Sequence, residues 1–550
     1  MNIKKEYLIL DCFIDEPACF GVPPFVSPYP RYIYGALIDA GVDSNSIKFI
    51  TINAIRETNY RIFDDYEIIF LIGGAVVPGK YLGSRIGSRS EIKRILQENK
   101  KLSFAIGGLI SHIIDGKQFN NFISIKGDIE KFAYEYAKGN PIDQSRNYRE
   151  VNKWANYGAG VVNMHPDYPN LICEIETYRG CPRKTHCSFC SESSFNKIDF
   201  RDEKDILNEI DELIKYGIKR FRIGRQADIL QYKTKFLEFK RGFPRPNPGP
   251  VQALFSQLKD KIKSGEIITL NIDNANPGTI FNFPEESSLI LQNIVDAITP
   301  GDTLALGVES FDPEVIKKNN LKVNKDELIE VIRIINEIGG KRIYGIPILL
   351  PGINLIHGLI GENKNTFKIN YEALTEIKDK GLLLKRINIR KLLPFPDTII
   401  YDRFKNMSQL ITNRYKFYKG MIRKDIDNFM LKQIYPVGTI LKDMKVEEIR
   451  FDYSYAKQIA SYSVTTKIPL SIKKNTFIDT MVISHRERSI IALPYPISIN
   501  SLPEKAVRLI PGFGVKRAAR IILERPFKHH EEIKNIIPNL DEKILNAIVL

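Results

Sequence analysis

The chain has 550 residues, of which 43% are hydrophobic and 26% are charged, with 35 glycines and 30 prolines. This composition excludes a disordered, a collagen-like and a disulfide-stapled protein. Lysine and arginine number 80 against 65 acidic residues, and the formal charge of +15 favours a polyanionic partner without identifying one. The most apolar stretch, 343–360, is broken by Pro347 and Pro351, so we expect no membrane span and a cytoplasmic location.

Residues 1–140 alternate apolar runs with helical patterns. The runs predicted to be strands are 7–13, 47–52, 66–72 and 102–106. This alternation predicts an α/β unit with a doubly wound parallel sheet, in which ligands bind beyond the carboxyl ends of the strands. Gly73-Gly74 and Gly107-Gly108 follow two of the runs, so they mark either a binding edge or tight turns. Residues 141–165 are polar and are interpreted as a linker.

A second strand–helix alternation covers residues 165–425. Its predicted strands are 171–177, 220–223, 268–272, 303–308, 342–348 and 386–389. Amphipathic helical patterns such as 202–216 and 325–338 lie between them. Strands joined in this way favour a closed or partly closed parallel barrel, a partial (β/α)6 unit with its chemistry at the carboxyl ends of the strands.

The pattern changes again near residue 432. Short β-rich segments separated by turn residues occur at 437–446, 461–469, 477–484 and 489–493. They predict a small antiparallel β-barrel within residues 432–500. Residues 501–550 are predicted to be helical.

Three of the six cysteines, Cys181, Cys187 and Cys190, lie close together just after the first predicted barrel strand. Six cysteines in so long a chain do not form a disulfide framework, so this group is interpreted as a metal site. Three thiolates suit tetrahedral zinc, with His186 or Cys173 as fourth ligand, or an iron–sulfur cluster with one open iron. The surrounding barrel pattern favours the iron–sulfur cluster.

The lead-in Arg179-Gly-Cys181 and the ending Cys187-Ser-Phe189-Cys190 resemble the radical S-adenosylmethionine superfamily. Five residues separate the first two cysteines here, where the family usually has three. The resemblance implies a [4Fe-4S] cluster on the three cysteines and S-adenosylmethionine at its open iron. It further implies reductive cleavage to a 5′-deoxyadenosyl radical, an electron donor such as ferredoxin or flavodoxin, and Phe189 beside the cofactor.

Further segments at predicted strand ends resemble the S-adenosylmethionine-binding segments of the family. The residues that the resemblance places there are Gln226, Asp228, Asn271, Asp273, Glu309, Ser310, Gly345, Pro347 and Glu362. The family commonly has Gly-Gly-Glu after its second strand, where it holds the amino group of the cofactor. Residues 222–228 of this chain occupy that place and lack the glutamate, so Gln226 or Asp228 would take its role. No catalytic residue is identified from the sequence.

Residues 506–521 resemble a helix-hairpin-helix, a motif that binds nucleic-acid backbones and also mediates protein contacts. The candidate nucleic-acid contacts are Gly512, Phe513, Gly514, Lys516, Arg517 and Arg520. Free backbone N–H groups at a helix start and nearby basic side chains suit phosphate binding. The preceding β-rich stretch resembles the TRAM-like RNA-binding barrel of methylthio-transferases, where Tyr453 and Tyr462 would suit base stacking.

The amino-terminal sheet resembles the cobalamin-binding domain of many relatives. The Asp-x-His-x-x-Gly cobalt ligand is missing, so cobalamin is kept only as a minor alternative. A second cluster on Cys12, Cys19 and Cys173 is a further minor alternative.

The order of the modules resembles an archaeal-type group of radical S-adenosylmethionine proteins with a carboxy-terminal helix-hairpin-helix. We therefore expect a transferase-type enzyme that modifies a nucleic acid, RNA rather than DNA. One alternative is a radical enzyme that acts on a protein or a small metabolite. The other is a non-enzymatic, zinc-containing adaptor that binds nucleic acid.

Overall fold

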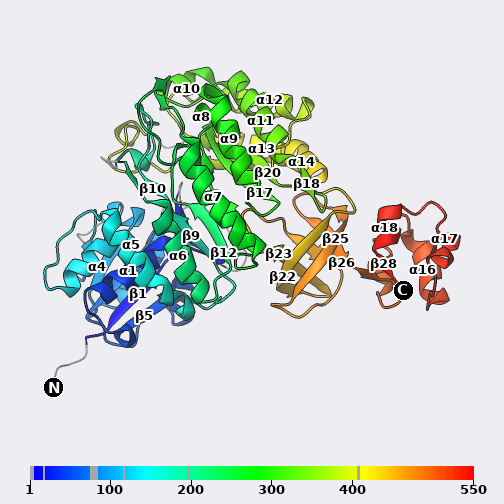
Figure 1. The fold of residues 1–550 in the computed structure, drawn as a ribbon, viewed down its shortest axis with the longest axis horizontal. Helices are drawn as coiled ribbons and strands as arrows, with labels where there is room; N and C mark the ends of the chain where they lie inside the picture. The colour runs from blue at the N-terminus through cyan, green and yellow to red at the C-terminus, as the bar shows by residue number, and fades with distance from the viewer. Residues whose placement is uncertain (1–4, 17–18, 75–83, 115–117, 195–197, 405–408) are drawn as a thin grey trace.

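The computed structural model describes residues 5–16, 19–74, 84–114, 118–194, 198–404 and 409–550. Figure 1 shows the amino-terminal sheet at one side, the central strands and helices above it, a small barrel beside them, and the last helices at the far end. In these ranges no helix has both the length and the apolar character needed to cross a bilayer.

The amino-terminal unit is a parallel sheet with the order β5-β1-β6-β7-β8. Its strands are β1 (Tyr7–Asp11), β5 (Ile47–Thr51), β6 (Ile68–Ile72), β7 (Phe104–Gly107) and β8 (Phe122–Ser124). Its helices are α1 (Pro28–Asp39), α2 (Ile52–Glu57), α3 (Arg89–Glu98) and α4 (Ile129–Ala137). Separate apolar cores cover the two faces, which confirms the predicted parallel α/β sheet, and the strand order is the flavodoxin-like one. β8 was not predicted from the sequence.

The predicted linker at 141–165 is wrong, because this segment contains α5 (Tyr148–Tyr157) packed on α1. Asn147 and Glu150 form a capping box at its start. Trp154 is fully buried, and its Nε1 donates to Asp39 Oδ2 at 3.0 Å. A capped helix with one apolar stripe is part of the fold, although its average composition is polar.

The central unit consists of two four-stranded sheets with the orders β15-β12-β9-β4 and β16-β17-β20-β21. Its main strands are β9 (Ile172–Glu176), β12 (Arg220–Gly224), β15 (Thr269–Ile272), β16 (Asn274–Ala275), β17 (Asp302–Glu309), β20 (Leu349–His357) and β21 (Arg386–Lys391). Outer helices are α6 (Glu203–Lys215), α7 (Pro248–Lys263), α8 (Pro277–Asn282), α9 (Pro284–Val295), α10 (Pro313–Lys318), α11 (Lys325–Gly339) and α12 (Thr366–Asp379). The remaining strand, β4 (Phe25–Val26), comes from the amino-terminal unit and joins the two units by pairing with β9.

The strand predicted at 342–348 is a two-stranded hairpin, and the long strand follows it. Its arms are β18 (Arg342–Ile343) and β19 (Ile346–Pro347), joined through Tyr344 and Gly345, which both have positive φ. β20 then runs through Pro351, which sits one residue before its pairing with β21 begins at Gly352. A proline has no N–H to donate, and it is tolerated where a strand is not yet paired on one side. Pro351 therefore does not end β20.

The predicted small β-barrel is present as a closed five-stranded barrel, with the order β22-β23-β24-β26-β25. Its strands are β22 (Ile440–Arg450), β23 (Tyr453–Gln458), β24 (Thr466–Ile468), β25 (Phe477–His485) and β26 (Ile490–Pro494). β23 was not predicted, and the β24–β26 pair is parallel, so the barrel is not wholly antiparallel. It shares one apolar core with the central strands. α13 (Gln409–Ile422), a π-helical turn (Arg423–Asp427) and α14 (Asn428–Ile434) lead into it.

The last residues form short helices on the far side of the small barrel (Figure 1). They are α15 (Glu504–Val507), α16 (Gly514–Glu524), α17 (His530–Ile536) and α18 (Glu542–Ala547), with the strand pair β27 (Ile497–Ser498) and β28 (Ile548–Val549). Their apolar core includes Met481 and Leu493 of the barrel, so the two modules pack together.

The crossing of α1 and α5 depends on two glycines. A Cβ on Gly35 would lie 1.9 Å from the carbonyl oxygen of Trp154, and one on Gly158 would lie 1.8 Å from that of Arg31. Backbone atoms cannot yield as a flexible side chain can, so the two helices would have to separate. Both sides of the contact therefore have a glycine where the two backbones approach most closely.

Gly35→Ala should destabilise the protein by about 1–3 kcal/mol or more, because overpacking forces backbone shifts. Gly420→Ala is the matched control: Gly420 lies in α13, a Cβ there would have nothing within 4 Å, and the variant should gain up to about 1 kcal/mol. Thermal unfolding followed by circular dichroism measures both. Equal melting temperatures for the two variants would contradict the packing.

Candidate functional site

The three clustered cysteines lie on the loop that follows β9 and the short strand β10 (Tyr178–Arg179). Gly180 has φ +91°, a conformation that favours glycine, and turns the chain into Cys181. Cys190 N donates to the carbonyl oxygen of Cys187 at 3.2 Å, which closes the end of the loop. We call residues 181–190 the cysteine loop. It stands at the carboxyl end of the first central strand, where parallel-strand enzymes place their chemistry.

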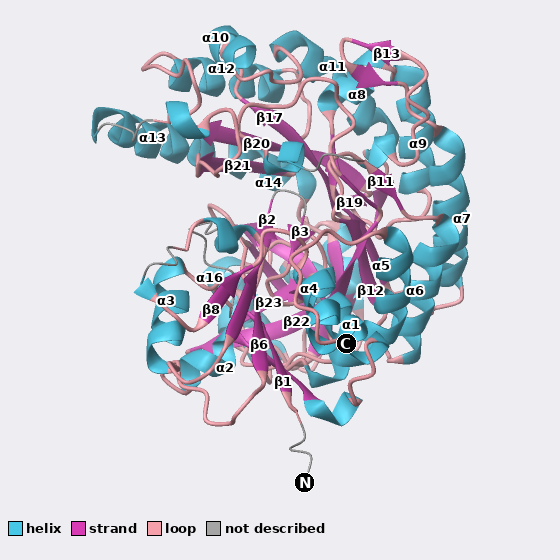
Figure 2. Cartoon of the chain, turned by 90° about the vertical axis from the view of Figure 1, so that its left-hand side faces the viewer, coloured by secondary structure: helices cyan, strands magenta, loops and turns pink. Residues whose placement is uncertain are grey.

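The cysteine loop faces a cavity of about 660 Å³. Its walls come from the amino-terminal unit, the carboxyl ends of the central strands, α13 and the small barrel. The lining residues used below are Asp15, Cys181, Arg183, Cys187, Phe189, Cys190, Glu192, Asp228, Asp273, Glu309, Lys322, Arg390, Lys391, Tyr415, Lys419 and Tyr462. Figure 2 shows β17, β20, β21 and α13 on one side of the molecule and β1, β6 and β8 on the other.

Positive side chains surround the thiol of Cys187. Arg183 Nη1 lies 3.3 Å from Cys187 Sγ and also donates to the carbonyl oxygen of Asn320. Burial lowers the pKa of Lys322, but the charges of Cys187 and Glu309 more than offset this and leave it raised. Burial raises the pKa of Cys181 to about 11. Cys181 thus keeps its proton until a metal displaces it, and Arg183 and Lys322 compensate the thiolate charge that metal binding creates.

The side chains considered as a fourth zinc ligand are engaged elsewhere. His186 Nε2 lies 3.2 Å from the carbonyl oxygen of Cys181, and Cys173 is fully buried within β9. Within the part of the chain that the structure describes, no three His, Cys, Asp or Glu side chains are arranged to hold one metal ion. Thiolates of a four-iron cluster bind different irons, so they need not converge on one point.

Four of the predicted cofactor residues line the cavity, namely Phe189, Asp228, Asp273 and Glu309. Burial raises the pKa of Asp228 to about 6, although Thr279 Oγ1 donates to its Oδ2 at 2.6 Å. Asp273 pairs with Arg222. Glu309 has φ +70° at a register shift in β17, and its Oε1 lies 3.6 Å from Lys322 Nζ. A strained carboxylate at a bulge is a feature typical of binding sites.

The other predicted cofactor residues are absent from the cavity wall. Gln226 Oε1 accepts from Thr177, Asn271 Oδ1 accepts from Ser461 N of the small barrel at 2.7 Å, and Glu362 Oε2 contacts His357 Nδ1.

Ser310 Oγ contacts Asn370. Gly345 and Pro347 lie in the β18–β19 hairpin, before β20 begins, and so at the opposite end of this strand from the cysteine loop. The structure does not bring these two residues together with the cysteines.

Several cavity residues were not identified from the sequence. Lys322 follows α10 in a loop, and Gly307 leaves room for it, since a Cβ there would lie 2.4 Å from Lys322 Nζ. Arg390 and Lys391 end β21, and the charged run around 385–391 could have indicated them. Asp15 reaches the cavity from a distant module, which only the tertiary structure reveals.

Buried ion pairs hold both ends of the cysteine loop. Before it, Arg179 donates to both carboxylate oxygens of Asp128, at 2.8 and 2.7 Å, in the amino-terminal unit. After it, Glu192 Oε1 accepts from Arg225 Nη1 at 2.8 Å. Arg225 also donates to Tyr29 Oη on α1 at 3.0 Å. The loop is thus tied to two different units by charge-assisted hydrogen bonds.

The space beside the glycine pairs of the amino-terminal sheet is occupied by other residues of the protein. A Cβ on Gly73 would lie 2.5 Å from Ile110 Cγ2, and one on Gly108 would lie 2.3 Å from the carbonyl oxygen of Gly73. These glycines therefore allow close packing of two neighbouring strand ends. Residues 75–83 of the same edge lie outside the described residues, as does the side chain of Cys19. Cys12 is buried in the core of this sheet.

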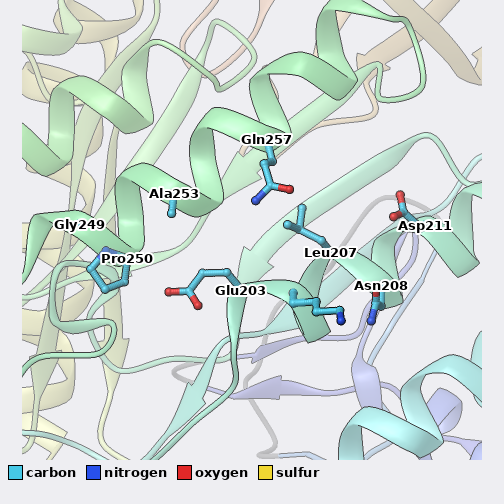
Figure 3. A pocket seen from close by; sticks show the side chains of 9 residues that line it. Glu203, Leu207, Asn208, Asp211, Gly249, Pro250, Ala253 and Gln257 are labelled. Carbon is cyan, nitrogen blue, oxygen red and sulfur yellow. The ribbon is translucent and has the colours of Figure 1, made fainter.

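A second hollow, of about 700 Å³, lies between α6 and α7 on the outside of the central unit (Figure 3). Its walls carry Glu203, Asn208, Asp211 and Gln257. Glu203 is already paired with Lys233. These helices are on the face away from the strand ends, so the hollow offers no cluster of reactive groups comparable to the cavity.

The candidate nucleic-acid residues lie at the start of α16. Gly512 and Gly514 have φ +88° and +57°, as a tight turn requires, and Phe513 is buried beneath them. Arg517 Nη1 donates to the carbonyl oxygen of Gly512, and Arg520 pairs with Glu524. Lys516 is exposed on the same helix.

The chain matches one family model and resembles proteins of two archaea. The model of the Radical SAM superfamily matches residues 175–368. An uncharacterised protein of Methanocaldococcus jannaschii is 40% identical over 507 residues, 88% of this chain and 92% of that protein. An uncharacterised protein of Archaeoglobus fulgidus is 35% identical over 529 residues, 96% of this chain and 97% of that protein.

Solved structures show a weaker likeness. The radical S-adenosylmethionine methyltransferase TsrM from Kitasatospora setae aligns with a TM-score of 0.47 and 12% identity, covering 72% of this chain and 77% of that one. The cobalamin-dependent S-adenosylmethionine radical enzyme OxsB aligns with a TM-score of 0.45 and 13% identity, covering 78% of this chain and 56% of that one. At these values the likeness supports no statement about function.

The family match covers the cysteine loop, and the archaeal relatives align over most of the chain. This chain therefore belongs to the radical SAM superfamily: it is an enzyme that uses a [4Fe-4S] cluster and S-adenosylmethionine and requires a reductant.

Proposed function

We propose that this enzyme modifies an RNA, with Cys181, Cys187 and Cys190 as the cluster ligands. The observation that carries the RNA assignment is Tyr462, a residue of the small barrel that lines the same cavity as the cysteine loop. The barrel is fixed there by the hydrogen bond from Ser461 N to Asn271 and by the ion pair between Arg220 and Asp443. A barrel that binds an RNA strand in this position delivers a base directly to the cavity.

The donor set fits a [4Fe-4S] cluster, because three thiols share one loop and Arg183 and Lys322 offset their charge. When bound, the cluster and S-adenosylmethionine supply the radical that abstracts a hydrogen atom from the substrate. Asp228, Asp273 and Glu309, which line the cavity, are the residues we assign to S-adenosylmethionine binding, beside Phe189. A ferredoxin or flavodoxin is the class of electron donor that we propose.

The surface of the small barrel suits a nucleic-acid strand. Lys467 Nζ lies 3.6 Å from the ring centroid of Tyr453, and Arg450 lies over the ring of Tyr455. Phe451, at the tip of the β22–β23 hairpin, is 97% exposed. Tyr453 and Tyr455 are partly exposed. Rings with cations beside them stack bases and attract phosphates, and the net charge of +15 adds long-range attraction.

A second candidate is a radical enzyme that acts on a protein substrate. It is favoured by two exposed apolar side chains on α16, Val515 and Leu523, which are 58% and 83% exposed. Exposed apolar side chains on α16 suit a protein contact better than a phosphate backbone. The two candidates differ in which partner the small barrel and α16 recognise.

RNA binding by the full-length enzyme should fall at least about tenfold between 50 and 200 mM salt, because phosphate contacts release counterions.

Tyr453→Ala should weaken RNA binding by about 1–3 kcal/mol, the usual loss for one stacking platform. Tyr157→Ala, which removes an exposed tyrosine of α5 beside Lys153, is the matched control and should bind normally. Filter binding measures the affinities, and nucleoside mass spectrometry should detect a new mass in RNA treated with the reduced enzyme and S-adenosylmethionine. Salt-independent binding with an unchanged nucleoside profile would favour the protein substrate.

Arg225→Gln should loosen the cysteine loop, because it leaves the buried carboxylate of Glu192 without its guanidinium. Breaking a buried pair costs about 3–5 kcal/mol, so the melting temperature and the iron content after reconstitution should both fall. Arg241→Gln is the control, since the Arg241–Glu327 pair is half exposed at the arginine and contributes about 0–1 kcal/mol. Full iron content in Arg225→Gln would show that this ion pair does not position the loop.

A further inference from the structure

A group of basic side chains lies in and behind the wall of the cavity that the cysteine loop also lines. Arg390 and Lys391 end β21, Lys419 lies on α13, Arg423 begins the π-helical turn, and Arg488 lies in the β25–β26 turn of the small barrel. We call these five residues the basic cluster. Arg390, Lys391 and Lys419 line the cavity itself, together with Tyr415.

Lys419 faces the other four cations of the basic cluster. Burial lowers the pKa of Lys419, and the charges of Arg423, Arg488, Arg390 and Lys391 lower it further. Lys419 Nζ donates only to neutral oxygens in the described contacts, those of Ile389 and Tyr415, at 3.0 and 2.9 Å.

The carboxylates near the basic cluster act on its arginines. Asp15 lies 3.6 Å from Arg390, which also acts on Glu309. Asp427 faces both Arg423 and Arg488, and Glu487 acts on Arg423. Among the residues that the structure describes, none forms an ion pair with Lys391 or Lys419. Converging like charges destabilise one another unless an anion binds between them.

The wall beside these cations is aromatic and apolar. Lys391 Nζ and Lys419 Nζ lie 5.2 and 5.1 Å from the ring centroid of Tyr415. Leu392, Phe395 and Tyr462 continue the wall. An anion beside a flat apolar surface matches a ligand that joins a phosphate to a planar ring. The π-helical turn at Arg423 is an independent sign, since such turns are concentrated at functional sites.

We infer that the basic cluster is a phosphate subsite, which holds a phosphate group of the substrate in the cavity that the cysteine loop lines. Lys391 and Lys419 contact the phosphate, Arg390 orients it, and Arg423 and Arg488 supply charge from behind the cavity wall. This inference rests on the proposed function in treating the cavity as the substrate site. The phosphate belongs either to an RNA strand or to a free nucleotide, and the ligand chemistry is the same in both.

The probe is inorganic pyrophosphate, titrated calorimetrically into the anaerobic holoenzyme at low salt. Lys391→Gln/Lys419→Gln should weaken binding at least about tenfold, because the phosphate loses two charge-assisted hydrogen bonds. The matched control is Lys416→Gln/Lys424→Gln, two exposed lysines from the same helical stretch, which should bind within about twofold of the parent. If the double variant at 391 and 419 unfolds, Arg488→Gln, outside the cavity, serves in its place with a smaller loss.

Competition then identifies the source of the phosphate. Displacement of pyrophosphate by a ribonucleoside monophosphate supports the subsite and indicates a free nucleotide. Displacement by an oligoribonucleotide alone supports the subsite and indicates an RNA strand.

No pyrophosphate binding by the parent enzyme, or equal loss in the control variant, would overturn the subsite. Iron content and reductive cleavage of S-adenosylmethionine are measured on the same samples, and new RNA nucleosides are assayed separately. If pyrophosphate does not bind while RNA is still modified, the subsite fails and the proposed function stands. If pyrophosphate binds normally but no RNA is modified, the proposed function fails and the subsite stands.

Discussion

The cysteine loop must keep three thiols in place although it has almost no regular structure of its own. Two buried arginine–carboxylate contacts meet this requirement, Arg179 with Asp128 before the loop and Arg225 with Glu192 after it. Because Asp128 belongs to the amino-terminal unit and Arg225 to the central unit, the loop is fixed only when both units are docked. Buried ion pairs contribute little net stability, but losing one partner is costly, which makes them suited to holding a defined geometry.

The same docking brings two kinds of cation to the cavity. Arg183 and Lys322 lie beside thiols and Glu309, so their charges have partners within the chain. Lys391 and Lys419 have no ion-pair partner among the described residues. The first two are therefore arranged for a cofactor that the chain itself holds, and the second two for an anionic ligand from outside. The small barrel closes this space by placing Tyr462 in the wall.

Local patterns were enough to predict the parallel α/β sheets, the small barrel and the position of the three cysteines, because these follow from short sequence periods and neighbouring residues. Where the prediction of elements failed, tertiary contacts outweighed local composition. The 141–165 segment is polar on average, yet Trp154 and two facing glycines pack it onto α1. The strand predicted at 342–348 is the β18–β19 hairpin, and the long strand β20 begins only at Leu349. Lys322 and Asp15 reach the cavity from separate loops, which sequence spacing cannot reveal.

The most direct test of the account is iron analysis of anaerobically reconstituted protein, compared among single Cys→Ala variants. The account predicts about four irons per chain and a reducible brown chromophore in the parent protein. It predicts loss of both when Cys181, Cys187 or Cys190 is replaced, and retention of both in Cys173→Ala, whose thiol is buried within β9. A parent protein with about one zinc and no iron, or a chromophore that survives all three replacements, would contradict it.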